Sequence, residues 1–87
     1  MFGLADVIDV YPNPNNGDFK VAINQPLEEQ LSIDIFDGTQ RLVHTRTLST
    51  LEGGQLQDFN LNGFEKGVYY IHFRKGEDLY VEKLIIF

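Results

Sequence analysis

Alternation of apolar and polar residues with a period of two is the feature that most limits what this chain can fold into. Three segments show it clearly: residues 18–24, 30–37 and 68–74. In the first of these, Phe19, Val21 and Ile23 fall on one face. Such alternation predicts strands with one buried face and one face in water, which is typical of antiparallel sheets.

The same pattern, in weaker form, extends through the rest of the chain. Four further strands are predicted at residues 5–11, 41–48, 55–61 and 79–87. Turn-forming residues separate the strands at 12–17, 37–38, 52–54, 62–63 and 75–76. Only residues 25–30 and 62–67 are predicted to hold a helical turn. Seven short strands at intervals of about 8–12 residues predict an all-β protein, an antiparallel β-sandwich of the Ig-like class.

Length and charge exclude several classes of protein. The 87 residues allow one small domain, and the composition, 43% hydrophobic and 23% charged, is that of a folded globule. Thirteen acidic against seven basic residues, without a basic cluster, argue against nucleic acid binding. The absence of cysteine excludes disulfides and thiolate zinc sites. No apolar run is long enough to span a bilayer.

The beginning of the chain leaves two alternatives for its location. Residues 1–6 have neither the basic region nor the apolar stretch of a signal peptide. Taken literally, this predicts a cytoplasmic domain. If the chain is a segment of a larger protein, the export signal lies upstream, and the first residues are the remnant of a linker. The choice between these alternatives decides the function.

Residues suited to catalysis are few and dispersed. Ser32 and Ser49 are the only serines, and neither lies in a nucleophile-elbow motif. His44 and His72 are predicted on the polar faces of their strands, without a partner for general-base chemistry. The acidic residues form no pair that can be selected for acid–base work. We therefore predict no catalytic residues and no cofactor.

The turn at residues 12–17 contains the strongest candidate for a metal site. Four neighbouring side chains offer the oxygen ligands that calcium prefers: Asn13, Asn15, Asn16 and Asp18. An EF-hand loop needs acids at alternate positions and a terminal glutamate, whereas this stretch has one acid. Turn geometry explains the asparagines and prolines better, so we predict no metal ion.

Aromatic side chains offer an alternative function. Tyr11, Tyr70 and Tyr80 are candidates to line a carbohydrate- or protein-binding face, with Tyr70 and Tyr80 as the main contacts. The competing explanation is cross-strand pairing of these rings on a sheet. A binding module of a secreted enzyme, built on the same sandwich, is therefore kept as the alternative.

The end of the chain departs from the alternating pattern, because a lysine is followed by four large apolar residues: Lys83, Leu84, Ile85, Ile86 and Phe87. A strand with one wet face does not place four such residues in succession. This strand is therefore either central and buried on both faces, or its outer face meets a partner. As an edge strand it would invite strand addition, including self-association. We predict that residues 79–87 form the main recognition surface.

Three segments taken together resemble a known family. They are Val10-Tyr11-Pro12-Asn13-Pro14 with Gly17, then Gly67-Val68-Tyr69-Tyr70-Ile71, and finally Lys83-Leu84-Ile85-Ile86. In this order and spacing, over about residues 7–87, the chain resembles the C-terminal sorting domain of the Por, or type IX, secretion system of Bacteroidetes. The positions that match the family motifs are Pro12, Asn13, Pro14, Gly17, Gly67, Tyr69 and Lys83.

The resemblance implies a secretion signal and not an enzyme. Domains of this family lie at the C-terminus of larger cargo proteins. These proteins reach the periplasm by an N-terminal signal peptide and are then exported by the outer-membrane translocon. A sortase-like surface protease commonly removes the domain, and the cargo is attached to anionic lipopolysaccharide or released. The resemblance thus implies a linker remnant or cleavage region at residues 1–6 and a sorting domain at residues 7–87.

One position departs from the family pattern. The family places a glycine about four residues after an aromatic residue, followed by a basic and aliphatic pair. Here the aromatic residue is Phe36, and the basic and aliphatic pair is Arg41 and Leu42. Gln40 occupies the usual glycine position, and Gly38 lies two residues earlier. The geometry of this hairpin is therefore left open.

Physical roles can be assigned to the matched residues. The two prolines are expected to end strand pairing, because proline lacks a backbone donor. Gly17 is expected to adopt a positive φ, and Gly67 to avoid a clash that a Cβ would cause. Tyr69 is predicted to anchor the core, and Lys83 to carry its charge to an edge.

Overall fold

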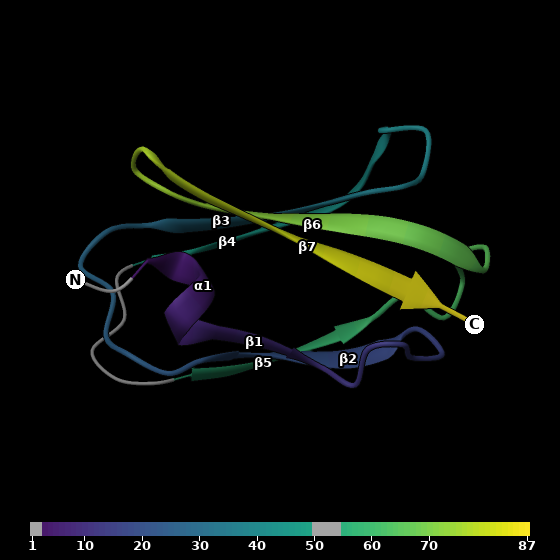
Figure 1. Ribbon diagram of the computed structural model, residues 1–87, viewed down its shortest axis with the longest axis horizontal. Helices are drawn as coiled ribbons and strands as arrows, with labels where there is room; N and C mark the ends of the chain where they lie inside the picture. The colour runs from purple at the N-terminus through teal and green to yellow at the C-terminus, as the bar shows by residue number, and fades with distance from the viewer. Residues whose placement is uncertain (1–2, 50–54) are drawn as a thin grey trace.

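The chain folds into two antiparallel sheets packed face to face (Figure 1). The computed structural model describes residues 3–49 and 55–87. Its elements are α1 (Leu4–Val7), β1 (Ile8–Tyr11), β2 (Asp18–Ile23), β3 (Leu31–Phe36), β4 (Leu42–Leu48), β5 (Gln55–Asn60), β6 (Gly67–Lys75) and β7 (Asp78–Ile86). One sheet has the order β1-β2-β5 and the other β4-β3-β6-β7. The predicted antiparallel β-sandwich is confirmed.

The core fills the space between the sheets with the side chains that the alternating pattern places on one face. The fully buried members come from four strands, namely Val21 and Ile23, Leu31, Ile33 and Ile35, Ile71 and Phe73, and Leu84. Aromatic rings contribute to the packing, since Phe19 and Phe59, which pair within the three-stranded sheet, stack with their centroids 5.1 Å apart. Burial of these faces is the main force that holds the two layers together.

The first residues form a helical turn where the pattern predicts a strand at 5–11. The side chains of Leu4 and Val7 are both buried, and a spacing of three residues puts them on one side of a helix. The Gly3 amide donates to the carboxylate of Asp6 at 3.0 Å, which stabilises the start of the turn. The prediction of a strand is therefore correct only for the second half of this segment.

Neither segment predicted to hold a helical turn contains a helix. Residues 25–30 are bends and an isolated bridge around the buried Leu27. Residues 62–67 form a turn, in which the Phe64 amide donates to the carbonyl oxygen of Leu61 at 3.0 Å. The turn predicted at 52–54 lies outside the described residues.

One histidine lies on the face opposite to the predicted one. His44 pairs with the core residue Ile35, so its side chain points inward. Its ring meets the ring of Phe59 edge to face at 5.6 Å, and its buried Nε2 has no hydrogen-bond partner among the described residues. The register between β3 and β4 shifts just after this pair, so simple alternation fails here. His72 lies on the outer face beside Phe36, as predicted.

Replacement of His44 by leucine is expected to raise the free energy of unfolding by about 1 kcal/mol, because an unsatisfied buried polar atom is removed. The apolar contact with Phe59 is kept. Urea denaturation followed by circular dichroism measures the change, with His72→Leu on the outer face as the control, expected within about 0.5 kcal/mol of the parent. A lower midpoint for His44→Leu would show that the imidazole contributes a favourable contact.

Candidate recognition surface

The proline–asparagine turn between β1 and β2 folds back onto the end of β7. The Asn13 Nδ2 donates to the carbonyl oxygen of Lys83 at 2.7 Å, and its Oδ1 accepts from the Ile85 amide at 3.1 Å. The Asn15 amide donates to the Ile85 carbonyl at 3.0 Å, and its carbonyl accepts from the Phe87 amide at 2.8 Å. Since β7 is an edge strand, the turn pairs backbone groups that the sheet leaves open.

The side chain of Asn15 holds this turn together from inside. It is 2% exposed. Its Nδ2 donates to the Pro12 carbonyl at 2.9 Å, and its Oδ1 accepts from the Gly17 amide at 2.8 Å. The Oδ1 of the next residue, Asn16, accepts from the Asp18 amide at 3.2 Å. Hydrogen bonding within the turn therefore gives each asparagine a structural role. Within residues 3–49 and 55–87, no group of three or more histidine or acidic side chains is arranged to hold a metal ion.

The two matched glycines are required for different reasons. Gly17 has φ +110°, as expected, and a Cβ there would lie 2.7 Å from Oδ1 and 3.0 Å from the backbone nitrogen of Asn62. Gly67 has φ +150°, but a Cβ there would meet no atom within 4 Å. The prediction that a Cβ at Gly67 would clash is therefore wrong. This position favours glycine because of its backbone conformation alone.

The last strand exposes one row of side chains. β7 lies at the edge of its sheet, so the alternative of a central strand is wrong. Leu84 and Ile86 are 0% and 3% exposed, whereas Ile85 and Phe87 are 38% and 65% exposed. Lys83 is exposed in the same row as Ile85, on an edge strand as predicted. The apolar run is thus divided between the core and an outer face that is open in the described structure.

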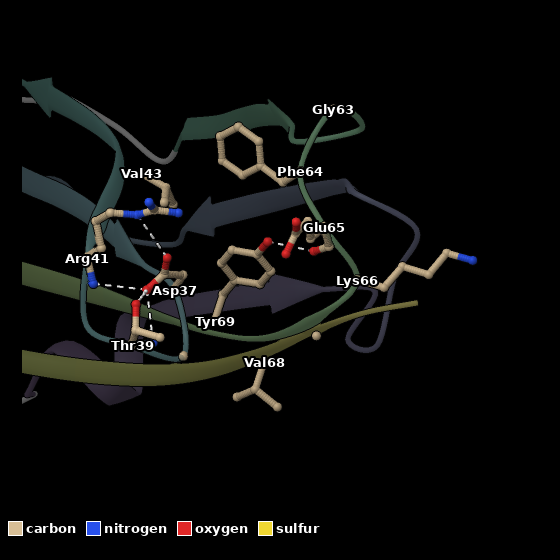
Figure 2. Close-up of a pocket in the computed structure, with 12 residues that line it drawn as sticks. Asp37, Thr39, Arg41, Val43, Gly63, Phe64, Glu65, Lys66, Val68 and Tyr69 are labelled. Carbon is tan, nitrogen blue, oxygen red and sulfur yellow. Dashed lines mark hydrogen bonds and ion pairs between the residues drawn. The ribbon is translucent and has the colours of Figure 1, made fainter.

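A pocket of about 560 Å³ opens between the turn after β3 and the loop before β6 (Figure 2). Tyr69 lies in it with its ring beside that of Phe64, at a centroid distance of 6.2 Å, and it is 5% exposed, as expected of a core anchor. Its hydroxyl donates to the Glu65 carbonyl at 2.5 Å. A tyrosine that bonds the backbone just upstream of the sixth strand is the tyrosine corner of Ig-like sandwiches. Burial, followed by the Glu65 charge, raises the pKa of this tyrosine.

The opposite wall of the pocket is organised by the carboxylate of Asp37. It accepts from the Thr39 hydroxyl at 2.7 Å and from the Thr39 and Arg41 amides, each at 2.9 Å. The Arg41 Nε adds an ion pair at 3.2 Å (Figure 2). The Thr39 hydroxyl is the largest cause that lowers the pKa of Asp37 to about 2, and the Arg41 amide is the next. The charged carboxylate therefore stabilises the folded turn.

The contribution of Asp37 is expected to depend on pH. Its pKa in the folded protein lies below its ordinary value of 3.8, so its stabilising effect is complete above about pH 4 and is lost as the pH falls towards 2. Asp37→Asn should therefore lower the urea midpoint at about pH 6, and the difference from the parent should shrink at about pH 2. A difference that stays constant between these pH values would contradict this role.

The same turn explains the departure at Gln40. With φ +67°, Gln40 is the only residue other than glycine with a positive φ in the described part of the chain. Its amide donates to the Asp37 carbonyl at 2.9 Å, which closes the turn. The hairpin thus has a residue in the left-handed conformation at the position where the family pattern has glycine. The backbone of this hairpin therefore matches the family pattern although the residue differs.

Replacement of Gln40 by glycine is expected to raise the free energy of unfolding by about 0.5–1 kcal/mol, because glycine adopts a left-handed conformation without steric cost. Thermal unfolding measures the change. Thr39→Gly in the same turn is the control, and it should be destabilising because it removes the hydroxyl that bonds Asp37. Equal effects of the two substitutions would contradict the explanation.

The three candidate aromatic contacts do not form a common face. Tyr80 points inward, where its ring stacks on Phe73 at 5.8 Å and its hydroxyl bonds the Glu82 carboxylate, which raises its pKa to about 12. Tyr70 is half-buried on the outer face of the four-stranded sheet, and Tyr11 is 45% exposed on the other sheet. The expected contact pair of Tyr70 and Tyr80 is therefore not brought together.

The matched motif segments instead meet at one end of the sandwich. In the β6–β7 register, Gly67 faces Ile86 and Tyr69 faces Leu84, while the proline–asparagine turn bonds the outer edge of the same strand. The turn that contains Gln40 lies beside the start of β6, across the pocket (Figure 2). Segments that are far apart in the sequence thus lie close together at this end of the sandwich.

Comparison with known proteins identifies the family of the chain. The family model described as secretion system C-terminal sorting domain matches residues 9–87. A search of curated proteins gave no match. Sorting domains of this family are non-catalytic signals that mark proteins for export. No helix in the described ranges is long and apolar enough to cross a membrane. The chain belongs to the family of secretion system C-terminal sorting domains.

Proposed function

We propose that this domain is the export signal of a larger cargo protein, which the type IX translocon carries from the periplasm across the outer membrane. The observation that supports this proposal is the docking of the Asn13 turn on the end of β7. The docking holds the last residues in the sheet and presents Lys83, Ile85 and Phe87 on an exposed row. In this proposal the translocon binds a folded surface and not a linear tail.

The proposal includes the fate of the domain after export. A sortase-like surface protease cuts upstream of β1, around or before residues 1–6, and the cargo is attached to anionic lipopolysaccharide or released. The helical turn α1 lies nearer the end of the molecule opposite to Phe87 (Figure 1). A cargo joined ahead of α1 therefore leaves the surface around the end of β7 accessible.

Export of a fluorescent reporter fused ahead of the domain tests the recognition surface in a bacterium that has this pathway. Lys83→Glu and Ile85→Asp change exposed side chains of β7, and we expect most of the reporter to remain in the periplasm. Leu56→Asp is the matched control, because Leu56 is 51% exposed on the other sheet, and its export should equal that of the parent. Normal export of both β7 variants would refute recognition through this row.

A further variant distinguishes a folded surface from a linear tail. Asn13→Ala leaves residues 83–87 unchanged but removes both side-chain bonds to β7. Reduced export of this variant, together with loss of export on deletion of residues 83–87, supports the folded surface. Loss of export on deletion alone would show that the translocon recognises the tail by its sequence.

A further inference from the structure

Two asparagines of the chain directly precede a glycine, Asn16 before Gly17 and Asn62 before Gly63. Asparagine is among the thermolabile residues of proteins. It loses its side-chain amide when the backbone nitrogen of the next residue reaches its side-chain carbonyl carbon, and glycine has no Cβ to obstruct that approach. The two sites are therefore alike in sequence, and their surroundings decide which of them reacts.

The backbone amide of Gly63 is accessible. Asn62 and Gly63 are the exposed central residues of a turn in the loop between β5 and β6, which the Phe64 amide closes by donating to the Leu61 carbonyl at 3.0 Å. In the described part of the chain, the Gly63 amide donates no hydrogen bond, and a Cβ on this residue would meet no atom within 4 Å. The Gly63 nitrogen therefore has neither a competing acceptor nor a neighbour that blocks its movement.

The side chain of Asn62 is held loosely. Its Nδ2 donates to the Asp18 Oδ1 at 3.5 Å, a distance beyond the usual range for such a bond. Its backbone amide donates to the Oδ1 of Asn60 at 3.0 Å. The turn has to open locally before the Gly63 nitrogen can reach the Asn62 Cγ. An exposed turn with so few hydrogen bonds opens at low cost in free energy.

The corresponding groups at Asn16 and Gly17 are held in place. The Gly17 amide is buried and donates to the Asn15 Oδ1 at 2.8 Å. The Asn16 Oδ1 accepts from the Asp18 amide at 3.2 Å, which fixes the side chain within its turn. Reaction at this site would require the loss of a buried hydrogen bond and the movement of a bonded side chain, and both are unfavourable. The fold therefore protects Asn16.

We propose that Asn62 is a site of spontaneous deamidation in the folded domain. Hydroxide takes the proton of the Gly63 amide, and the amide nitrogen then forms a bond to the Asn62 Cγ. The bond from Cγ to Nδ2 breaks, and Nδ2 takes a proton from water and leaves as ammonia, which regenerates the hydroxide. The cyclic imide that remains is opened by water at either of its carbonyl carbons, which gives aspartate or isoaspartate. Every step is a substitution at a carbonyl carbon, so no oxidant or reductant takes part.

The modification changes the charge where the loop contacts the proline–asparagine turn. The Leu61 amide donates to the Gly17 carbonyl at 2.7 Å, and a Cβ on Gly17 would lie 2.7 Å from the Asn62 Oδ1. Deamidation replaces the donor to Asp18 by a carboxylate and adds one negative charge to a chain whose net charge is -6. Because two carboxylates at this distance repel each other, the modified domain is expected to be less stable. The inference concerns the domain itself and does not rest on the proposed export function.

The effect of the added charge can be measured without waiting for the reaction. Asn62→Asp carries the charge of the product, and we expect it to unfold at a lower temperature than the parent. Added salt should reduce the difference, because salt screens the repulsion between exposed carboxylates. Asn16→Asp does not contact Asp18 through its amide nitrogen and is the control for the charge alone. A thermal midpoint of Asn62→Asp equal to that of the parent would contradict the predicted repulsion.

Incubation of the intact folded domain in mildly alkaline buffer, followed by peptide mass spectrometry, tests the site of reaction. We expect conversion at Asn62 to be at least about tenfold faster than at Asn16, a difference of about 1.4 kcal/mol in activation free energy. Isoaspartate should appear together with aspartate at position 62, because direct hydrolysis of the side-chain amide gives aspartate alone. Equal rates at the two asparagines, or faster conversion of Asn16, would overturn the proposal.

Two controls separate the fold from the local sequence. Gly63→Ala adds a Cβ that meets open space in the folded domain but obstructs the approach of the nitrogen to Cγ, so conversion of Asn62 should slow by at least about tenfold. In concentrated guanidinium chloride the two asparagines lose their different surroundings, and their rates should become similar. An unchanged rate in Gly63→Ala would refute attack by this nitrogen, and a rate ratio that persists in the unfolded chain would refute protection of Asn16 by the fold.

Discussion

Replacement of Asn15 by alanine is expected to lower the free energy of unfolding by about 2–4 kcal/mol, although the side chain is polar and lies in a turn. The substitution leaves the buried Gly17 amide and the part-buried Pro12 carbonyl without their partner, and it removes a side chain that is only 2% exposed. Each unsatisfied buried group costs about 1–3 kcal/mol. This is a large fraction of the stability of a domain of this size, about 5–10 kcal/mol.

Urea denaturation measures this loss, and Asn16→Ala is the matched control. Asn16 is the next residue, is exposed, and forms a single side-chain bond to the Asp18 amide. Its replacement should cost no more than about 1 kcal/mol. Equal midpoints for the two variants would mean that burial of Asn15 does not matter, and that the turn is held by its main-chain bonds to β7 alone.

Gly17→Ala is the second substitution with a large expected effect, a loss of about 2–4 kcal/mol. Two costs combine at this position. The φ of +110° is one that side-chain-bearing residues rarely adopt, and the added Cβ would approach the backbone nitrogen of Asn62 to 3.0 Å and its Cα to 3.1 Å. Because these neighbours are backbone atoms, a side-chain movement cannot relieve the contact.

Gly63 provides a control in the neighbouring loop. A Cβ at Gly63 would meet no atom within 4 Å, so Gly63→Ala should change stability by less than about 0.5 kcal/mol. Gly67→Ala should lie between the two, since it has an unfavourable φ but free space. A ranking by thermal midpoint in any other order would contradict this separation of conformational and steric costs.

The strands could be predicted from the sequence because their signal is local. A period of two is visible wherever one face is buried, and the observed β2, β3 and β6 agree with the predicted segments to within one residue at each end. The α1 turn was missed because four residues are too few to show a helical period. His44 was misplaced because a register shift between β3 and β4 breaks the alternation, and such a shift depends on pairing.

The candidate site was less accessible to sequence reasoning, because it depends on contacts between distant residues. The resemblance pointed to Asn13 and Lys83 separately, but their hydrogen bond joins positions 70 residues apart, and no local pattern predicts it. The sequence assigned Asn15 to turn geometry in preference to a calcium site, but it did not predict the burial of its side chain or its two bonds to the backbone. The local signal for its actual role was an asparagine two residues before a glycine in a turn, which is typical of a side chain that bonds the backbone.

The bond between Asn13 and Lys83 also has a consequence for the order of events during synthesis. It connects a turn made near the beginning of the domain with a strand made near its end, so the two parts meet only after the intervening chain has left the ribosome. A chain released early by premature termination lacks β7 and cannot assemble the surface. If export requires this surface, only cargo whose translation is complete is exported, and truncated cargo is not.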